Sequence, residues 1–112
     1  MTPDQNIELL NSFKEYKEGW LGRESEPIPI EFINVCLNHI DKFLIQPNIT
    51  AFDNGICLYW HFGENDSIEI NVSDMIDYVV TLGEDIVYDM VIEAKFISQY
   101  ANRVLKQQLR NA

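Results

Sequence analysis

The sequence lacks lysine and arginine over nearly half of its length. Between Lys42 and Lys95 every charged side chain is an aspartate or a glutamate, apart from the neutral His61. The whole chain of 112 residues carries 18 acids against 8 bases, which gives a formal net charge of −10. Nucleic acids and anionic lipid surfaces bind to clusters of cations, so the overall field repels both and attracts basic surfaces instead.

Recognisable catalytic and ligand-binding motifs are also missing. The chain has no Cys-x-x-Cys, no His-x-x-x-His and no glycine-rich phosphate loop. With only two histidines, a nucleophile, a base and an orienting group would come together only by coincidence of folding. We therefore predict a protein that is not an enzyme and that carries no cofactor and no metal. An enzyme with an unrecognised site ranks third among the alternatives.

Long apolar runs and disulfide frameworks are absent as well. No run approaches the roughly 18 apolar residues that cross a bilayer, and the start at Met1 has no basic or apolar signal region. Cys36 and Cys57 fall within periodic apolar segments, which is typical of buried free thiols in a reducing compartment. We expect a cytoplasmic protein that does not bind membranes.

The apolar content indicates one folded domain. Apolar residues make up 46% of the chain and aromatic residues 12%, which is enough to offset chain entropy. A chain of this length builds a single core, so residues 1–112 are predicted to form one domain.

The first part of the chain predicts two helices. A threonine–proline pair begins a helix over residues 3–18, in which apolar residues recur at threes and fours. A loop rich in glycine and proline follows, and Trp20 is expected to anchor it at the edge of the core. Pro29 opens a second helix that ends before Pro47, with His39 expected on its solvent-exposed face.

From Asn48 onward the apolar period changes to two, which predicts strands. Asp53-Asn54-Gly55 is typical of a tight hairpin turn. The expected strands are Ile49–Phe52, Ile56–Phe62, Ser67–Ser73 and Ile76–Leu82. The segment Ile86–Val91 fits either a fifth strand or a helix that begins at Glu84. We favour a short strand, followed by a helix from Ile92 to Leu109.

This order of elements predicts an α+β fold: an antiparallel meander of four or five strands, with the two N-terminal helices and the C-terminal helix packed on one face of the sheet. Ile56, Leu58, Trp60, Ile68, Ile70 and Val72 are expected on the buried face. The C-terminal helix has a wide apolar stripe, made of Phe96, Ile97, Tyr100, Val104 and Leu105. That stripe predicts packing either on the first helix or on a second copy, as a homodimer.

The other face of the sheet is predicted to be acidic. Ordinary solvated faces intersperse both signs of charge, so a face without bases suggests a docking surface for a cationic partner. The expected partner-binding residues are Glu64, Asp66, Glu69, Asp77, Asp85 and Asp89. The alternative is that the acidity serves solubility alone.

A second candidate site is a small-ligand site at Tyr59 and His61, beside Trp60. It would make the protein a small-molecule-binding sensor or regulator that uses this part of the sheet. The plainer interpretation is a histidine packed on the second face of the sheet, because aromatic stripes on strands usually belong to a core.

Several short patterns together resemble a known group of proteins. They are Trp20-x-Gly22, Glu26-Pro27-x-Pro29, Pro47-x-Ile49, Asp53-Asn54-Gly55-Ile56-x-Leu58-x-Trp60 and Ile68-x-Ile70. A widespread group of small uncharacterised bacterial and phage-borne proteins carries W-x-G, a P-x-P helix start and D-G-[IV]-x-L-x-W. The resemblance covers about residues 16–73 and departs from the pattern at Asn54.

The resemblance implies a scaffold without catalytic residues and a source in a bacterium, a phage or a mobile element. In such settings small acidic proteins often act as antitoxins or as inhibitors of host defence, including anti-CRISPR-type proteins. The hypothesis from the sequence is a non-enzymatic acidic protein that sequesters or inhibits a basic partner, such as a nucleic-acid-binding enzyme.

Overall fold

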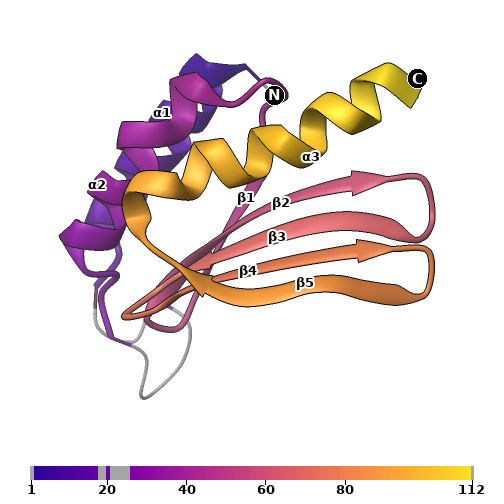
Figure 1. Ribbon diagram of the computed structural model, residues 1–112. Coiled ribbons are helices and arrows are strands. Elements are labelled where there is room, and N and C mark those ends of the chain that lie inside the picture. Colours follow the sequence, from indigo (N-terminus) through magenta and orange to yellow (C-terminus); the bar gives the residue numbers. More distant parts are fainter. Residues whose placement is uncertain (1, 18–19, 21–25, 112) are drawn as a thin grey trace.

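The computed structural model describes residues 2–17, 20 and 26–111. The helices are α1 (Pro3–Ser12), α2 (Ile30–His39) and α3 (Ile97–Asn111), and short 3₁₀ turns cover Phe13–Glu15, Ile40–Lys42 and Ala94–Phe96. The strands are β1 (Asn48–Phe52), β2 (Gly55–Phe62), β3 (Asp66–Val72), β4 (Ile76–Leu82) and β5 (Asp85–Ile92). Figure 1 shows these elements as one sheet with helices on one side, so the predicted α+β class is confirmed.

The ends of the helices differ from the prediction, while the strands agree closely. Helix α1 ends at Ser12 and tightens into a 3₁₀ turn, and α3 begins only at Ile97. The ambiguous segment over residues 86–91 belongs to strand β5. Most of the glycine- and proline-rich loop lies outside the described residues, but Trp20 is half-buried and packs 4.7 Å from Tyr16, measured between ring centroids.

The five strands follow the chain across the sheet in the order β1-β2-β3-β4-β5, and every neighbouring pair is antiparallel. Tight turns make this meander possible. Asn54, Gly63 and Gly83 adopt positive φ angles of 63°, 67° and 66°, a conformation that asparagine and glycine tolerate best. Side chains alternate between the two faces along β1 to β4, and a register shift interrupts the alternation in β5.

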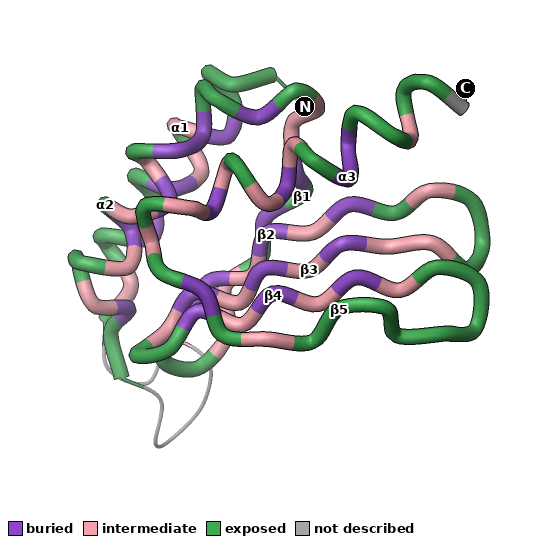
Figure 2. Tube along the Cα trace, in the orientation of Figure 1, coloured by how far each residue is buried: buried purple, intermediate pink, exposed green. Residues whose placement is uncertain are grey.

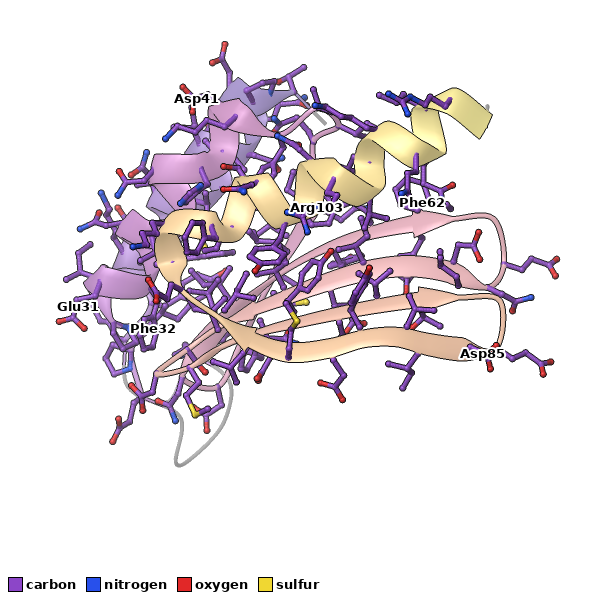
Figure 3. All side chains as sticks on the ribbon, in the orientation of Figure 1. Glu31, Phe32, Asp41, Phe62, Asp85 and Arg103 are labelled. Atoms are coloured by element: carbon purple, nitrogen blue, oxygen red, sulfur yellow. The ribbon has the colours of Figure 1, made fainter. Side chains whose placement is uncertain are left out.

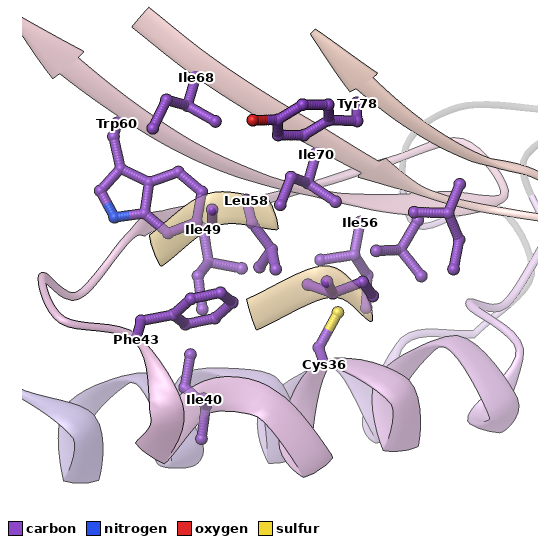
Figure 4. Close-up of a cluster of buried hydrophobic side chains, with 14 of the residues drawn as sticks. Cys36, Ile40, Phe43, Ile49, Ile56, Leu58, Trp60, Ile68, Ile70 and Tyr78 are labelled. Carbon is purple, nitrogen blue, oxygen red and sulfur yellow. The ribbon is translucent and has the colours of Figure 1, made fainter. Parts of the chain in front are cut away.

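The core lies between the sheet and the helices. All six residues predicted on the inner face of the second and third strands are buried: Ile56, Leu58, Trp60, Ile68, Ile70 and Val72. Figure 4 shows Phe43, Ile40 and Cys36 packing onto this face from the helical layer. The predicted inner face of the sheet is thus confirmed.

Side chains from three elements hold the connection between α2 and β1 in place. Asn6 of α1 is fully buried, and its Nδ2 donates to the carbonyl oxygen of Pro47 at 3.0 Å. Trp60 Nε1 donates to the carbonyl oxygen of Ile45 at 2.8 Å. Asn102 of α3 donates to the carbonyl oxygen of Lys42 at 2.8 Å. Backbone groups without a ladder partner are satisfied in this way, which ties both terminal helices to the sheet.

His39 does not face solvent, so that prediction is wrong. Only 7% of the residue is exposed, and its Nδ1 lies 2.9 Å from Ser98 Oγ at the start of α3. The chain returns from β5 and sets α3 against the end of α2. Local periodicity along α2 contains no information about that distant contact.

The apolar stripe of α3 is used within the chain. Ile97, Ala101, Val104 and Leu105 are buried in the common core, while Phe96 and Tyr100 are half-buried. The homodimer predicted through this helix depended on a surplus of free apolar surface, and most of that surface is covered by the protein's own sheet.

Replacing Trp60 by alanine is expected to lower the free energy of unfolding by about 3–5 kcal/mol. The substitution removes a 3% exposed ring that packs edge-on against Phe43 at 5.1 Å between centroids, together with the bond to Ile45. Trp60→Phe keeps most of the packing and leaves the Ile45 carbonyl unpaired, at a cost of about 1–3 kcal/mol. Denaturant unfolding measures both. A loss below about 1 kcal/mol for Trp60→Ala contradicts the assignment.

The stability of the protein is expected to depend on pH through His39. Burial, followed by the nearby Lys42, lowers the pKa of His39 from 6.5. The neutral ring is favoured in the folded state, so its contribution is complete above about pH 6.5 and declines as the pH falls toward the lower folded value. Unfolding free energies of the parent and of His39→Gln, followed from neutral to acidic pH, should diverge below about pH 6.5. Parallel curves would contradict the lowered pKa.

Candidate functional site

The face of the sheet that points away from the helices is the candidate site, and we call it the outer face. No described helix lies over it (Figure 1). Its residues alternate with those of the inner face along β1 to β4, and the same holds on each side of the register shift in β5. They are Asn48, Thr50, Phe52, Cys57, Tyr59, His61, Ser67, Glu69, Asn71, Asp77, Val79, Thr81, Ile86, Asp89 and Val91.

Three of the predicted carboxylates meet on this face. Glu69 and Asp89 both pair with Val79, one from each neighbouring strand. Asp77 lies two residues before Val79 on β4, diagonal to both carboxylates. Diagonal neighbours in an antiparallel sheet are about 7–8 Å apart, and the screening length at physiological salt is about 8 Å. Glu69, Asp77 and Asp89 therefore act on a charged partner as one group, which we call the acidic triad.

The thiol of Cys57 responds to the charge of Glu69. Cys57 is half-buried on the outer face and is diagonal to Glu69, because Cys57 pairs with Asn71 and Tyr59 pairs with Glu69. Burial, followed by the charge of Glu69, raises the pKa of Cys57 to about 11. Cys36, which is fully buried, has its pKa raised to about 12 by burial and by Cys57. Both cysteines are free thiols.

Asp85 does not share the outer face with the triad. The pairing of β4 with β5 shifts between Val80 and Thr81, where a β-bulge adds one residue to β5. Beyond the bulge Asp85 pairs with Leu82, on the helix side of the sheet. Figure 3 shows Asp85 at the far end of the sheet, at the turn between these strands.

Glu64 and Asp66 belong to that same end of the sheet. Glu64 is exposed in the turn between β2 and β3, while Asp66 is half-buried at the start of β3. Asp66 Oδ1 accepts a hydrogen bond of 2.8 Å from the backbone nitrogen of Gly83, which joins the two turns. The six predicted residues therefore form two groups, three on the outer face and three at the sheet end.

Tyr59 and His61 lie next to each other on the outer face, with ring centroids 5.3 Å apart at an angle of 69°. This edge-to-face arrangement is favourable, because the positive edge of one ring contacts the negative face of the other. The geometry places the pair beside the acidic triad.

Two features of the helix side were not anticipated from the sequence. A cavity of about 620 Å³ lies along α3, and its lining includes Arg103, Lys106 and Arg110. A cleft of about 170 Å³, which we call the aromatic cleft, lies between α3, β4 and β5 and is lined by Tyr78, Tyr88, Met90, Tyr100 and Arg103. The spacing of the bases along the last helix is the feature of the sequence that could have indicated the cavity along α3. No local feature of the sequence indicates the aromatic cleft.

Within residues 2–17, 20 and 26–111, no three His, Cys, Asp or Glu side chains gather as metal ligands. The described helices include none that is long and apolar enough to cross a membrane.

Comparison with protein-family models, with curated proteins and with solved structures found no match to this chain. The resemblance to small bacterial and phage proteins therefore stays a prediction from the sequence pattern.

The reactivity of Cys57 provides a test of the field at the outer face. Since the thiolate is the nucleophile, Glu69→Gln should lower the pKa of Cys57 and speed its alkylation by a neutral reagent, by about threefold for each half-unit of pKa. Glu64→Gln, in the turn, is the matched control and should have no effect. Cys57→Ser identifies any signal from Cys36. Equal rates for the parent and Glu69→Gln would show that Glu69 does not act on this thiol.

Proposed function

We propose that this protein is a non-enzymatic binding protein, and that its outer face docks onto a basic surface of a partner protein to sequester or inhibit it. The observation that carries the proposal is the composition of this face. It holds the acidic triad, and all five strands contribute to it without a single lysine or arginine.

The distribution of charge supports an oriented approach. The bases that follow Lys42 in the sequence are Lys95 and three residues of α3, which lies on the opposite side of the sheet (Figure 1). A cationic partner is attracted by the outer face and repelled by the bases of α3. Such a field raises association rates and fixes the orientation of the encounter more than it raises affinity.

Apolar side chains stand between the carboxylates. Val79 lies between Glu69 and Asp89, and Val91 pairs with Asp77. Tyr59 adjoins Glu69 in the next strand. Protein interfaces combine apolar and aromatic contacts at their centre with charged groups around them, and this face offers both.

The sign of the charge narrows the class of partner. A surface that repels nucleic acid and attracts cations suits a protein that itself binds nucleic acid, because such proteins present clustered lysine and arginine. We propose that the partner is a nucleic-acid-binding enzyme. The acidic outer face would bind to the basic surface of this enzyme, in place of the phosphate backbone of its nucleic acid.

The test replaces Glu69, Asp77 and Asp89 by lysine together. Partner capture from cells of the native host, followed by kinetics with the purified partner, should show an association rate lower by about tenfold or more. The control replaces Asp4, Glu8 and Glu31, exposed residues of α1 and α2, by lysine and changes the net charge equally. That control should bind like the parent, and unfolding curves confirm that both variants are folded.

The dependence of the association rate on ionic strength is a second test of the same complex. Raising the salt from about 0.01 M to about 0.15 M shortens the screening length from about 30 Å to about 8 Å, so association of the parent should slow markedly. Undiminished capture by the folded triad variant, or an association rate that ignores salt, would contradict the proposal and leave the acidity as a solubility feature.

A further inference from the structure

Strand β5 is an exposed edge of the sheet. It is last in the strand order, and within the described part of the chain no segment pairs with its outer side. Four of its large apolar residues are exposed: Ile86 by 64%, Val87 by 43%, Tyr88 by 49% and Val91 by 53%. Figure 2 shows β5 exposed along most of its length, whereas β2, β3 and β4 alternate between buried and partly buried residues.

The chemistry of β5 is that of an edge left open. Alternate backbone N–H and C=O groups of an edge strand point away from the sheet without partners. Proteins commonly block such edges with lysine, proline, β-bulges or very short strands. Strand β5 has eight residues with neither lysine nor proline, and its one bulge leaves Tyr88–Ile92 in regular pairing. The opposite edge, β1, has five residues and presents no large exposed apolar side chain.

The aromatic cleft lies directly beside this edge. Tyr88 and Met90 of β5 form one wall, and Tyr100 and Arg103 of α3 contribute to its lining. Arg103 lies 5.3 Å from the centre of the Tyr100 ring, a cation–π contact that holds both side chains. At about 170 Å³ the cleft is smaller than typical small-molecule sites and comparable to one large side chain.

We propose that β5 accepts an extended segment of the basic partner as a sixth strand, with an apolar side chain of that segment in the aromatic cleft and lysine or arginine side chains on the outer face. The inference rests on the proposed function and names how the partner is held. Main-chain hydrogen bonds provide affinity in this mode, and pockets for alternate side chains provide specificity.

The charges around β5 determine which side of the added strand is basic. On the outer face the first side chains beside it are Asp89 and Val91, with Asp77 in the next strand. On the helix side, the charged residue that lines the aromatic cleft beside Tyr88 and Met90 is the cation Arg103. A segment that alternates basic and apolar residues meets both conditions, and the reversed register places its cations against Arg103, which disfavours it.

A second copy of this chain is a poor occupant of the same edge. Each copy carries a net charge of −10, and β5 itself contains acids and no base. Pairing two β5 strands would bring like charges together across the junction, which destabilises a sheet pair. A basic segment paired with β5 avoids this repulsion, because its charges are opposite to those of β5.

The bulge limits where the added strand pairs. The register between β4 and β5 changes at Val80 and Thr81, and the regular part of β5 runs from Tyr88 to Ile92. The aromatic cleft lies beside this regular part, since Tyr88 and Met90 line it. Both observations place the docked segment on the second half of β5.

The probe is a synthetic peptide about as long as β5 that alternates lysine and valine, compared with the same peptide N-methylated at alternate residues. Amide hydrogen exchange of the protein is measured by NMR with and without each peptide. With free peptide at about 100 times its Kd, exchange of the edge amides of Tyr88–Ile92 should slow by about 100-fold, and amides of β1 should not change. The N-methylated peptide should give no protection.

Variants of the protein distinguish pairing of the peptide with the β5 edge from general electrostatic attraction. Val91→Lys places a cation at the edge and should weaken the lysine–valine peptide by about tenfold or more. Asn11→Lys places the same charge at an exposed position of α1, which does not belong to the outer face, and should have little effect. Tyr88→Ala should weaken binding without changing the charge.

Three outcomes would overturn the inference. Equal binding of both peptides without protection of β5 means that the outer face attracts cations but adds no strand, which leaves the proposed function intact. Equal protection by a threonine–valine peptide means that the edge does not select basic segments. Protection of β5 at high protein concentration without peptide means that a second copy occupies the edge. Failure of any basic peptide to bind contradicts the proposed function itself.

Discussion

The structure depends on one constraint, namely that the described helices form a single layer on one face of a five-stranded sheet. The contacts that fix this layer are few and specific. Asn6, Trp60 and Asn102 bind the backbone between α2 and β1, and His39 joins α2 to α3 through Ser98. Because every described helix packs on the inner face, none of them covers the outer face. Its composition is then free to serve a second purpose, and along β3, β4 and β5 it is acidic.

The exposed β5 edge has different surroundings on the two faces of the sheet. Toward solvent, the edge adjoins the acidic triad; toward the helices, it adjoins the aromatic cleft and Arg103. Helix α3 stabilises the fold through Ile97, Ala101, Val104 and Leu105, yet leaves Tyr88 half-exposed. Strand β5, which is the most exposed strand, thus has carboxylates on one side and an aromatic cleft with a cation on the other. An extended chain with one basic and one apolar side fits such an edge, whereas a globular acidic surface does not.

The sequence predicted what depends on local periodicity and missed what depends on distant contacts. Alternation along residues 56–82 placed the inner face correctly, and the Asp-Asn-Gly turn fixed the first hairpin. His39 was expected in solvent because its neighbours along α2 are polar, but α3 covers it. Asp85 has the same parity as Asp89 and was expected beside it, but the bulge in β5 reverses the parity. The aromatic cleft joins three elements that are separate in the chain, so no local pattern announces it.

The most direct measurement of the central claim is a map of the surface that contacts the purified partner, obtained from chemical-shift changes and cross-saturation of the isotopically labelled protein in the complex. The account predicts effects concentrated on the outer face, at Glu69, Val79 and Asp89, and continuing to the edge of β5. Effects confined to the exposed residues of α1 and α2, or to the basic side of α3, would contradict it, because the partner would then be held by a surface that the acidic triad does not reach.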